Sequence, residues 1–225
     1  LQETKSPVEK MPVEAFEALG YRWRVARGEK GYNGVAILSR VPLEEVPSLD
    51  FCGRGDARHV AARLPDGTVL HDLYVPAGGD VPDPEANDKF RHKLDFVAEM
   101  RERFARPGAR EILVGDLNIA PREDDVWSHR QMLKVISHTP VEAEALDAAQ
   151  AAGGWVDAVR RHHPEGKLYS WWSYRARDWA ASDRGRRLDH VWTTPAVETR
   201  GARILREARG WEQPSDHVPV IVELA

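Results

Sequence analysis

Polar side chains that bind metals and protons recur at the ends of predicted strands. In the segment GDLNIAP, Asp116 and Asn118 follow the apolar run 111–114, and their spacing of two residues places them on one face of an extended chain. A single aspartate at the end of a strand is most often a turn former or a cap. Similar residues recur in LQETK, RRLDHVW and PSDHVPV, which contribute Glu3, Asp189, Asp216 and His217.

Taken together, these residues predict a site where a hard divalent cation acts on a phosphate. Carboxylate and amide oxygens with one histidine suit Mg²⁺, with Mn²⁺ as a substitute, and no Cys/His cluster with zinc spacing occurs. Asp189 can accept one imidazole N–H of His217 and so fix its tautomer. Hydrolysis of a phosphodiester needs an activated water, neutralised phosphoryl charge and a stabilised leaving group, and this set supplies all three.

Other hydrolytic schemes fit the sequence less well. It contains no G-x-S-x-G elbow, no P-loop and no G-x-G-x-x-G turn, and Ser39 and Ser215 have no evident base. The single cysteine, Cys52, is expected to be a structural thiol rather than a nucleophile, and it fits a reducing compartment. Since no export signal is evident, we expect a cytoplasmic protein.

The composition fits a globular domain with one locally basic segment. The 225 residues suit one large domain, and 42% apolar with 30% charged residues excludes a disordered chain. No apolar window reaches the roughly 20 residues of a membrane span. The net charge of −4 argues against non-specific coating of nucleic acid. Segment 158–187, however, has a net charge of +5 and contains Trp171 and Trp172, so it is either a solvated loop or an edge that follows phosphates.

Short strands interspersed with a few helices predict an α/β sandwich. An Asp-Gly pair at 66–67 predicts a hairpin. Apolar residues at helical spacing predict one helix over 84–105, and a second begins at Thr139, where Glu142 allows a capping box. The predicted strands are residues 21–26, 34–39, 58–64, 68–75, 111–114, 188–193 and 217–224.

The order of several motifs resembles one known family. LQETK, GYNGVAILSR, LYVPAGG, GDLNIAP, YSWWSYR, RRLDHVW and SDHVPV occur in the order found in the exodeoxyribonuclease III family of the endonuclease/exonuclease/phosphatase superfamily. The resemblance extends over residues 1–225. It implies a single domain with a four-layered α/β sandwich, in which two mainly antiparallel sheets pack face to face with helices outside. GDLNIAP and YSWWSYR resemble the DNA-repair branch of the superfamily.

The resemblance implies a Mg²⁺-dependent DNA phosphodiesterase of base-excision repair. Such a hydrolase incises duplex DNA on the 5′ side of abasic sites and removes nucleotides from 3′ ends as a double-strand 3′–5′ exonuclease. Its partner is double-stranded DNA with abasic sites or 3′ ends, it acts as a monomer, and no membrane is involved. We also expect the arginines of residues 160–187 to contact the DNA backbone.

Family resemblance implies a role for each residue at the reacting phosphate. By analogy, Asp116 orients or deprotonates the attacking water, and Asn118 binds that water or a phosphate oxygen. Asp189 holds His217, and His217 contacts the scissile phosphate.

Metal and substrate roles are implied in the same way. Glu3 is the main metal carboxylate and Asp216 is a second one. Tyr74 matches a tyrosine that touches the phosphate or supports the leaving group, and Trp171 matches an aromatic that lines the pocket for a base-less sugar. Without the resemblance, core packing is the simpler interpretation of both aromatic residues. The remaining substrate-binding candidates are Arg175 and Arg177.

Three departures from the family pattern bear on these expectations. Relatives carry about one further strand and helix before LQETK, including an asparagine on the metal side of the site. We therefore expect that the chain lacks its first strand and helix, and that residues 1–225 alone fold poorly and have little activity. Robust Mg²⁺-dependent turnover by these residues would contradict this. Ala77 stands where many relatives have Asn or Gln, and Ser173 replaces a common Asp, which bears on fine specificity.

Two alternative functions remain open on the sequence. One is a phosphatase or lipid phosphodiesterase of the same superfamily with the same metal chemistry. The other is a DNA-binding module that has lost its chemistry, but the intact set of candidate site residues argues against it.

Overall fold

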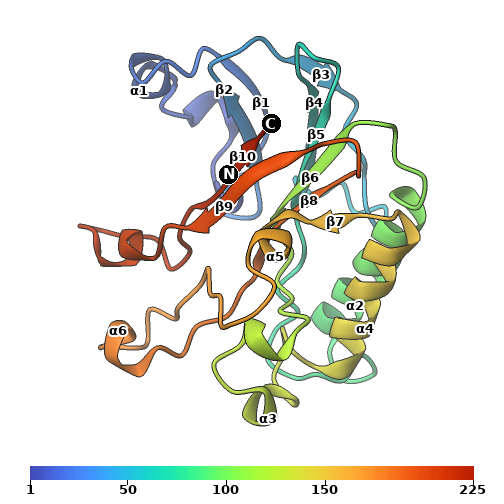
Figure 1. The fold of residues 1–225 in the computed structure, drawn as a ribbon, viewed down its shortest axis with the longest axis vertical. Coiled ribbons are helices and arrows are strands. Elements are labelled where there is room, and N and C mark those ends of the chain that lie inside the picture. Colours follow the sequence, from blue (N-terminus) through green and yellow to red (C-terminus); the bar gives the residue numbers. More distant parts are fainter.

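A computed structural model describes residues 1–225, and a mixed six-stranded sheet forms its centre (Figure 1). The strand order is β3 (Glu44–Val46), β4 (His59–Arg63), β5 (Val69–Tyr74), β6 (Glu111–Asp116), β8 (Asp189–Thr193) and β7 (Val156–Asp157). Strands β5 and β6 are parallel, whereas β8 is antiparallel to β6. In this register Asp116 lies opposite Tyr74 on one side and Asp189 on the other. The sheet thus brings three of the predicted site residues to one edge.

Two helices cover one face of this sheet (Figure 1). They are α2 (Asp88–Arg103) and α4 (Pro140–Ala152), which pack against each other. Phe96 of α2 and Leu146 of α4 share the largest core cluster with Leu113 of β6. Burial of these large apolar side chains on a sheet face is the main stabilising term of such a layer.

Side-chain caps fix where both helices begin. The Asn87 side chain accepts the N–H of Lys89 at 3.1 Å, so the helix predicted over 84–105 starts after this residue. α4 begins where the sequence predicts, because Glu142 accepts the N–H of Thr139 at 3.2 Å and its hydroxyl at 2.6 Å.

Two antiparallel ribbons cover the opposite face of the sheet. The ribbons are β1 (Trp23–Arg27) with β2 (Val35–Ser39), and β9 (Thr199–Ile204) with β10 (Val220–Leu224). Ile37 of the first ribbon packs in a cluster with Val60, and Val222 of the second packs against the cluster that contains Val191. The predicted layered α/β sandwich is confirmed, although its second sheet consists of two separate ribbons.

The remaining elements are short. The strand predicted over 217–224 begins at Val220, so His217 lies in the loop before β10. The sequence missed β3 and β7, which are too short to show alternation, and β9, which contains Gly201. None of the helices has the length and apolarity needed to cross a bilayer. The short helices are α1 (Val13–Ala18), α3 (His129–Met132), α5 (Ala158–His162), α6 (Trp179–Ser182), and the 3₁₀ turns Val8–Lys10, Glu123–Asp125 and Arg206–Gly210.

A buried charged cluster holds the segment that leads into β8. Arg187 pairs with both oxygens of Asp125, at 2.7 and 3.0 Å, and with Asp157 at 2.9 Å. Arg160 pairs with the same Asp125 at 2.5 Å. The expectation that all arginines of 160–187 contact DNA is therefore wrong for Arg160 and Arg187, because both are buried and their charges are matched by carboxylates.

Candidate active site

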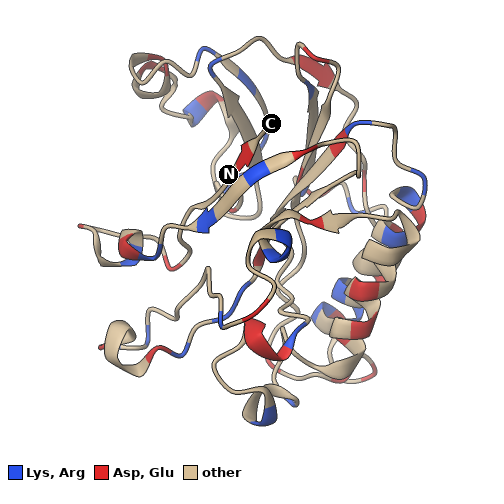
Figure 2. Ribbon diagram, in the orientation of Figure 1, with Lys and Arg blue, Asp and Glu red and all other residues tan.

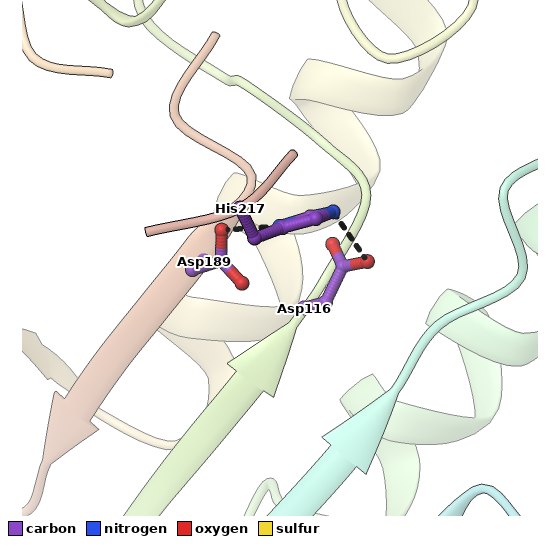
Figure 3. Close-up of side chains that lie close together, drawn as sticks. All are labelled: Asp116, Asp189 and His217. Carbon is purple, nitrogen blue, oxygen red and sulfur yellow. Dashed lines mark hydrogen bonds and ion pairs between the residues drawn. The ribbon is translucent and has the colours of Figure 1, made fainter. Parts of the chain in front are cut away.

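Three side chains from distant parts of the chain converge at the end of the central sheet (Figure 3). Asp116 is the last residue of β6, Asp189 is the first of β8, and His217 comes from the loop before β10. Each offers one ligand atom, and these atoms lie within 4.8 Å of one another. The sequence placed all three at strand ends, and the structure brings them together.

A chain of hydrogen bonds orients the imidazole of His217. Its Nδ1 donates to Asp189 Oδ2 at 2.8 Å, and the Ser170 hydroxyl donates to the same oxygen at 2.6 Å. The Ser170 hydroxyl oxygen in turn accepts the backbone N–H groups of Leu188 and Asp189, at 3.0 and 3.1 Å. The Nε2 atom is left facing Asp116 Oδ2 at 3.8 Å. This fixes the tautomer and aims Nε2 toward the centre of the cluster.

The charges around His217 favour its protonated form. Burial opposes the charge, but Asp189, and then Asp116 and Asp216, outweigh it and raise the pKa of His217 to about 10. Burial raises the pKa of Asp116 to about 7, even though His217 opposes this shift. At neutral pH the imidazolium can therefore donate a hydrogen bond to an anion, and Asp116 has a pKa close to that of an effective general base.

Asp116 and Asn118 are joined by a turn rather than by strand alternation. Asn118 donates its backbone N–H to Asp116 Oδ1 at 2.9 Å and its side-chain amide to Oδ2 at 3.0 Å. Asn118 has a positive φ of 52°, so it has left the strand. Leu117 between them is buried in the core. The preceding Gly115 is required, since a Cβ there would lie 1.9 Å from the Leu73 carbonyl oxygen.

Glu3 and Tyr74 form a second pair near the cluster. The Tyr74 hydroxyl donates to Glu3 Oε1, and Lys5 Nζ lies 2.8 Å from Glu3 Oε2. The segment that contains Glu3 and Thr4 packs closely against Gly34, because a Cβ on Gly34 would lie 2.0 Å from Thr4 Oγ1. Burial, and then the bond to Glu3, raise the pKa of Tyr74 above its usual value. Tyr74 therefore stays a hydroxyl donor.

Trp171 lies directly beside the cluster. Its backbone pairs with that of His217, and its indole Nε1 donates to Asp216 Oδ2 at 3.0 Å. The Arg186 guanidinium lies over its ring, 4.9 Å from the centroid. The neighbouring Trp172 is buried in the core, so only one ring of the pair faces the site.

Not every candidate joins this cluster. The side chains of Arg175 and Arg177 are exposed on the loop before α6 and form no hydrogen bond or ion pair. In Figure 2 this loop carries both basic and acidic positions. The sequence also missed Ser170, which nothing in its local pattern marks, apart from its position in the motif YSWWSYR.

The donor set around the cluster fits a hard divalent cation. Glu3 and Asp216 are not part of the group formed by Asp116, Asp189 and His217. The negative charges of both nevertheless favour the charged form of Lys5. The bond to Glu3 raises the pKa of Lys5, burial opposes this, and Asp216 adds to the rise. The two carboxylates therefore already attract a positive charge, and their oxygens are the ligand type that Mg²⁺ and Mn²⁺ prefer.

With this geometry established, comparison with known proteins identifies the family. Residues 1–217 match the model of the endonuclease/exonuclease/phosphatase family. The chain belongs to this family. The matched range includes every candidate site residue named above.

Three similar proteins are named for their activity or their bound DNA. The structure of an AP endonuclease from Archaeoglobus fulgidus is 27% identical with a TM-score of 0.91, covering 99% of this chain and 86% of that one. A 3′ phosphatase from Neisseria bound to a product DNA hairpin is 30% identical with a TM-score of 0.89, covering 100% and 87%. An exodeoxyribonuclease from Bacillus subtilis (strain 168) is 26% identical, covering 98% and 84%.

Proposed function

We propose that this protein is a Mg²⁺-dependent DNA phosphodiesterase of base-excision repair. It incises duplex DNA on the 5′ side of abasic sites and degrades 3′ ends as a 3′–5′ exonuclease. The observation that carries this proposal is the convergence of Asp116, Asp189 and His217 on the sheet end. Similarity to an AP endonuclease, an exodeoxyribonuclease and a DNA-bound phosphatase supports DNA as the substrate.

Each residue at the proposed reaction centre has its own role in the reaction. Asp116 accepts the proton of the attacking water, and Asn118 holds Asp116 and contacts the water or a phosphate oxygen. His217, oriented by Asp189, donates from Nε2 to a phosphoryl oxygen and stabilises the charge that develops there. Tyr74 is placed to support the phosphate or the leaving group.

Metal and DNA contacts surround this centre. Glu3 and Asp216 would hold the cation, with Lys5 moving aside from Glu3. Bound Mg²⁺, or Mn²⁺ as its substitute, supplies positive charge to the phosphate. Trp171 lines the pocket for the base-less sugar, while Arg175 and Arg177 contact the DNA backbone from their exposed loop.

A metal-dependence assay on the purified protein tests this proposal. The substrates are a duplex with one abasic site, the same duplex without it, and a duplex with a recessed 3′ end. We expect incision at the abasic site and loss of 3′ nucleotides with Mg²⁺, and neither with excess EDTA. Unchanged turnover in EDTA would contradict the metal requirement, and an intact abasic strand in Mg²⁺ would contradict the activity.

The main rival is a phosphatase or lipid phosphodiesterase of the same family. The same preparation should be offered a phosphoinositide and the abasic duplex at equal concentrations. Faster turnover of the phosphoinositide would favour the rival. A 3′-phosphate terminus belongs in the comparison, since one similar structure is that of a 3′ phosphatase.

The proposal includes a monomer in a reducing, cytoplasmic environment. The single Cys52 is half-buried, and burial, followed by Glu99, raises the pKa of its thiol to about 11. A thiol with a raised pKa is a poor nucleophile, which supports the structural role expected from the sequence. Sedimentation of the purified protein would test the monomeric state.

A further inference from the structure

We propose that Lys93 is a positioning residue that, with Glu142, holds the backbone of Asn118 in its working conformation. This inference rests on the proposed function, because it assigns a purpose to a buried ion pair behind the same site. Lys93 lies on α2 and Glu142 at the start of α4, and neither touches the cluster of Asp116, Asp189 and His217.

All three donors of the Lys93 ammonium are in use. The side chain is fully buried, and its Nζ lies 2.5 Å from Glu142 Oε1, 2.8 Å from the Asn118 carbonyl oxygen and 3.3 Å from that of Ala77. An ammonium has three N–H donors, so this set is complete. Gly78 lies against the stem, since a Cβ there would be 3.0 Å from Lys93 Cδ.

These contacts tie together the two loops that leave the parallel strands. Ala77 follows β5, whose last residue is Tyr74, and Asn118 follows β6, whose last residue is Asp116. One ammonium therefore fixes the spacing of the two loops directly behind the proposed reaction centre.

Hydrogen bonds on several sides hold Asn118 in a left-handed backbone conformation. Its φ of 52° lies in the region that most non-glycine residues avoid and that asparagine adopts more readily than the others. Its N–H and side-chain amide are held by Asp116, and its carbonyl is held by Lys93. Loss of the carbonyl contact would free the peptide to rotate, and the amide would then leave Asp116.

Glu142 is itself held by hydrogen bonds. Its carboxylate accepts the N–H of Ser137 at 3.0 Å and the N–H and hydroxyl of Thr139. Ser137 is in turn bonded to the motif GDLNIAP, because its carbonyl accepts the N–H of Ala120 at 2.7 Å. The Lys93 ammonium is thus paired with a carboxylate that is hydrogen-bonded to Ser137, and Ser137 is hydrogen-bonded to the loop that contains Asn118.

A gain in stability alone does not explain why Lys93 and Glu142 form a buried ion pair. Burying two charges carries a desolvation cost, and a buried pair can often be replaced by apolar residues without loss of stability. The contact that an apolar pair cannot reproduce is the donation to the Asn118 carbonyl.

The test is a double-mutant cycle between Lys93→Met and Asn118→Ala, measured as kcat and KM on the abasic duplex. Lys93→Met should lower kcat about 10–100-fold and leave KM within about twofold, since it removes support and no DNA contact. In the Asn118→Ala background, which is already slow, Lys93→Met should have no further effect on kcat. A merely structural lysine would lower kcat equally in both backgrounds.

Two further variants complete the design. Lys93→Met/Glu142→Gln leaves no lone buried charge and keeps the helix cap, so it should fold even if the single variant does not, and it should show the same low kcat. Arg101→Met, which removes an exposed cation from the same helix, should leave kcat unchanged. A normal kcat in the Lys93 variants, or an effect on KM alone, would overturn the inference. An inactive wild-type protein would instead overturn the proposed function.

Discussion

The sheet-end cluster and the basic loop 171–184 differ in how their side chains are held. At the sheet end, Asp116, Asp189 and His217 are fixed by hydrogen bonds to buried or half-buried neighbours. In the loop, Arg175 and Arg177 are exposed and bind nothing in the protein. In one region the polar side chains are therefore held by neighbours in the protein, and in the other, two cationic side chains are left without a partner in the protein.

The base of the basic loop is held by alternating aromatic and cationic side chains. Arg206 lies 5.4 Å from the Trp172 ring centroid and 5.6 Å from that of Trp179. Arg209 lies 5.8 Å from Trp179 and 5.0 Å from Tyr174. Such contacts are worth about 0.5–2 kcal/mol each, so together they help to hold the loop against the fold.

This difference separates two kinds of mutational effect. Changes at the sheet end should act on the rate of the bond-breaking step, because pre-oriented groups stabilise the transition state. Changes in the loop should act on DNA affinity and its dependence on salt, because exposed cations there would meet phosphates in the proposed complex. The first and third of the following predictions test this separation, and the second tests the buried charges that hold the segment before β8.

Asp189→Asn should lower kcat by about 10²–10⁴-fold with little change in KM, because an amide neither orients nor charges His217 as the carboxylate does. Steady-state kinetics on the abasic duplex measures this. The matched control is Asp66→Asn in the β4–β5 hairpin, far along the sheet from the cluster, which should keep normal kcat. Equal losses of kcat in Asp189→Asn and Asp66→Asn would contradict the assignment of the chemistry to the sheet end.

Asp125→Asn should lower stability by about 3–5 kcal/mol, because it leaves Arg187 and Arg160 buried with less opposing charge. Burial alone would raise the pKa of Asp125, but Arg187 and Arg160 lower it to about 2. This stabilisation is therefore complete above the usual carboxyl pKa of 3.8 and is lost as pH falls toward 2. Denaturant titrations at pH 7 and pH 3 should show a smaller difference between variant and wild type at pH 3.

Arg175→Ala/Arg177→Ala should weaken DNA binding several-fold and leave the single-turnover rate at saturating enzyme unchanged. The slope of log affinity against log salt should fall by about 1 for each lost phosphate contact. Fluorescence anisotropy over a range of salt concentrations measures this. An unchanged slope with a slower rate would mean that these arginines act on chemistry.

The sequence was most informative where residue type and local position were enough. Asp116, Asp189 and His217 stand out as polar residues at the ends of apolar runs, and the cap of α4 is local to Thr139 and Glu142. Each of these features can be predicted from a few neighbouring residues in the sequence.

Features that depend on tertiary packing could not be read in this way. Ser170 reaches Asp189 because the loop before Trp171 crosses the start of β8. Lys93 and Arg187 look like solvated charges in the sequence, yet both are buried and paired. Their burial depends on helices and loops that meet from distant positions, which charge patterning does not reveal.

The most direct test of a reaction centre at the sheet end is the single-turnover rate on an abasic duplex with saturating enzyme and Mg²⁺. Asp116→Asn and His217→Ala should each lower this rate by at least about 100-fold while DNA binding stays close to that of the wild type. His163→Ala, which removes an imidazole bonded to the Ala202 carbonyl, is the control. Near-full hydrolysis by both site variants would contradict the proposed centre.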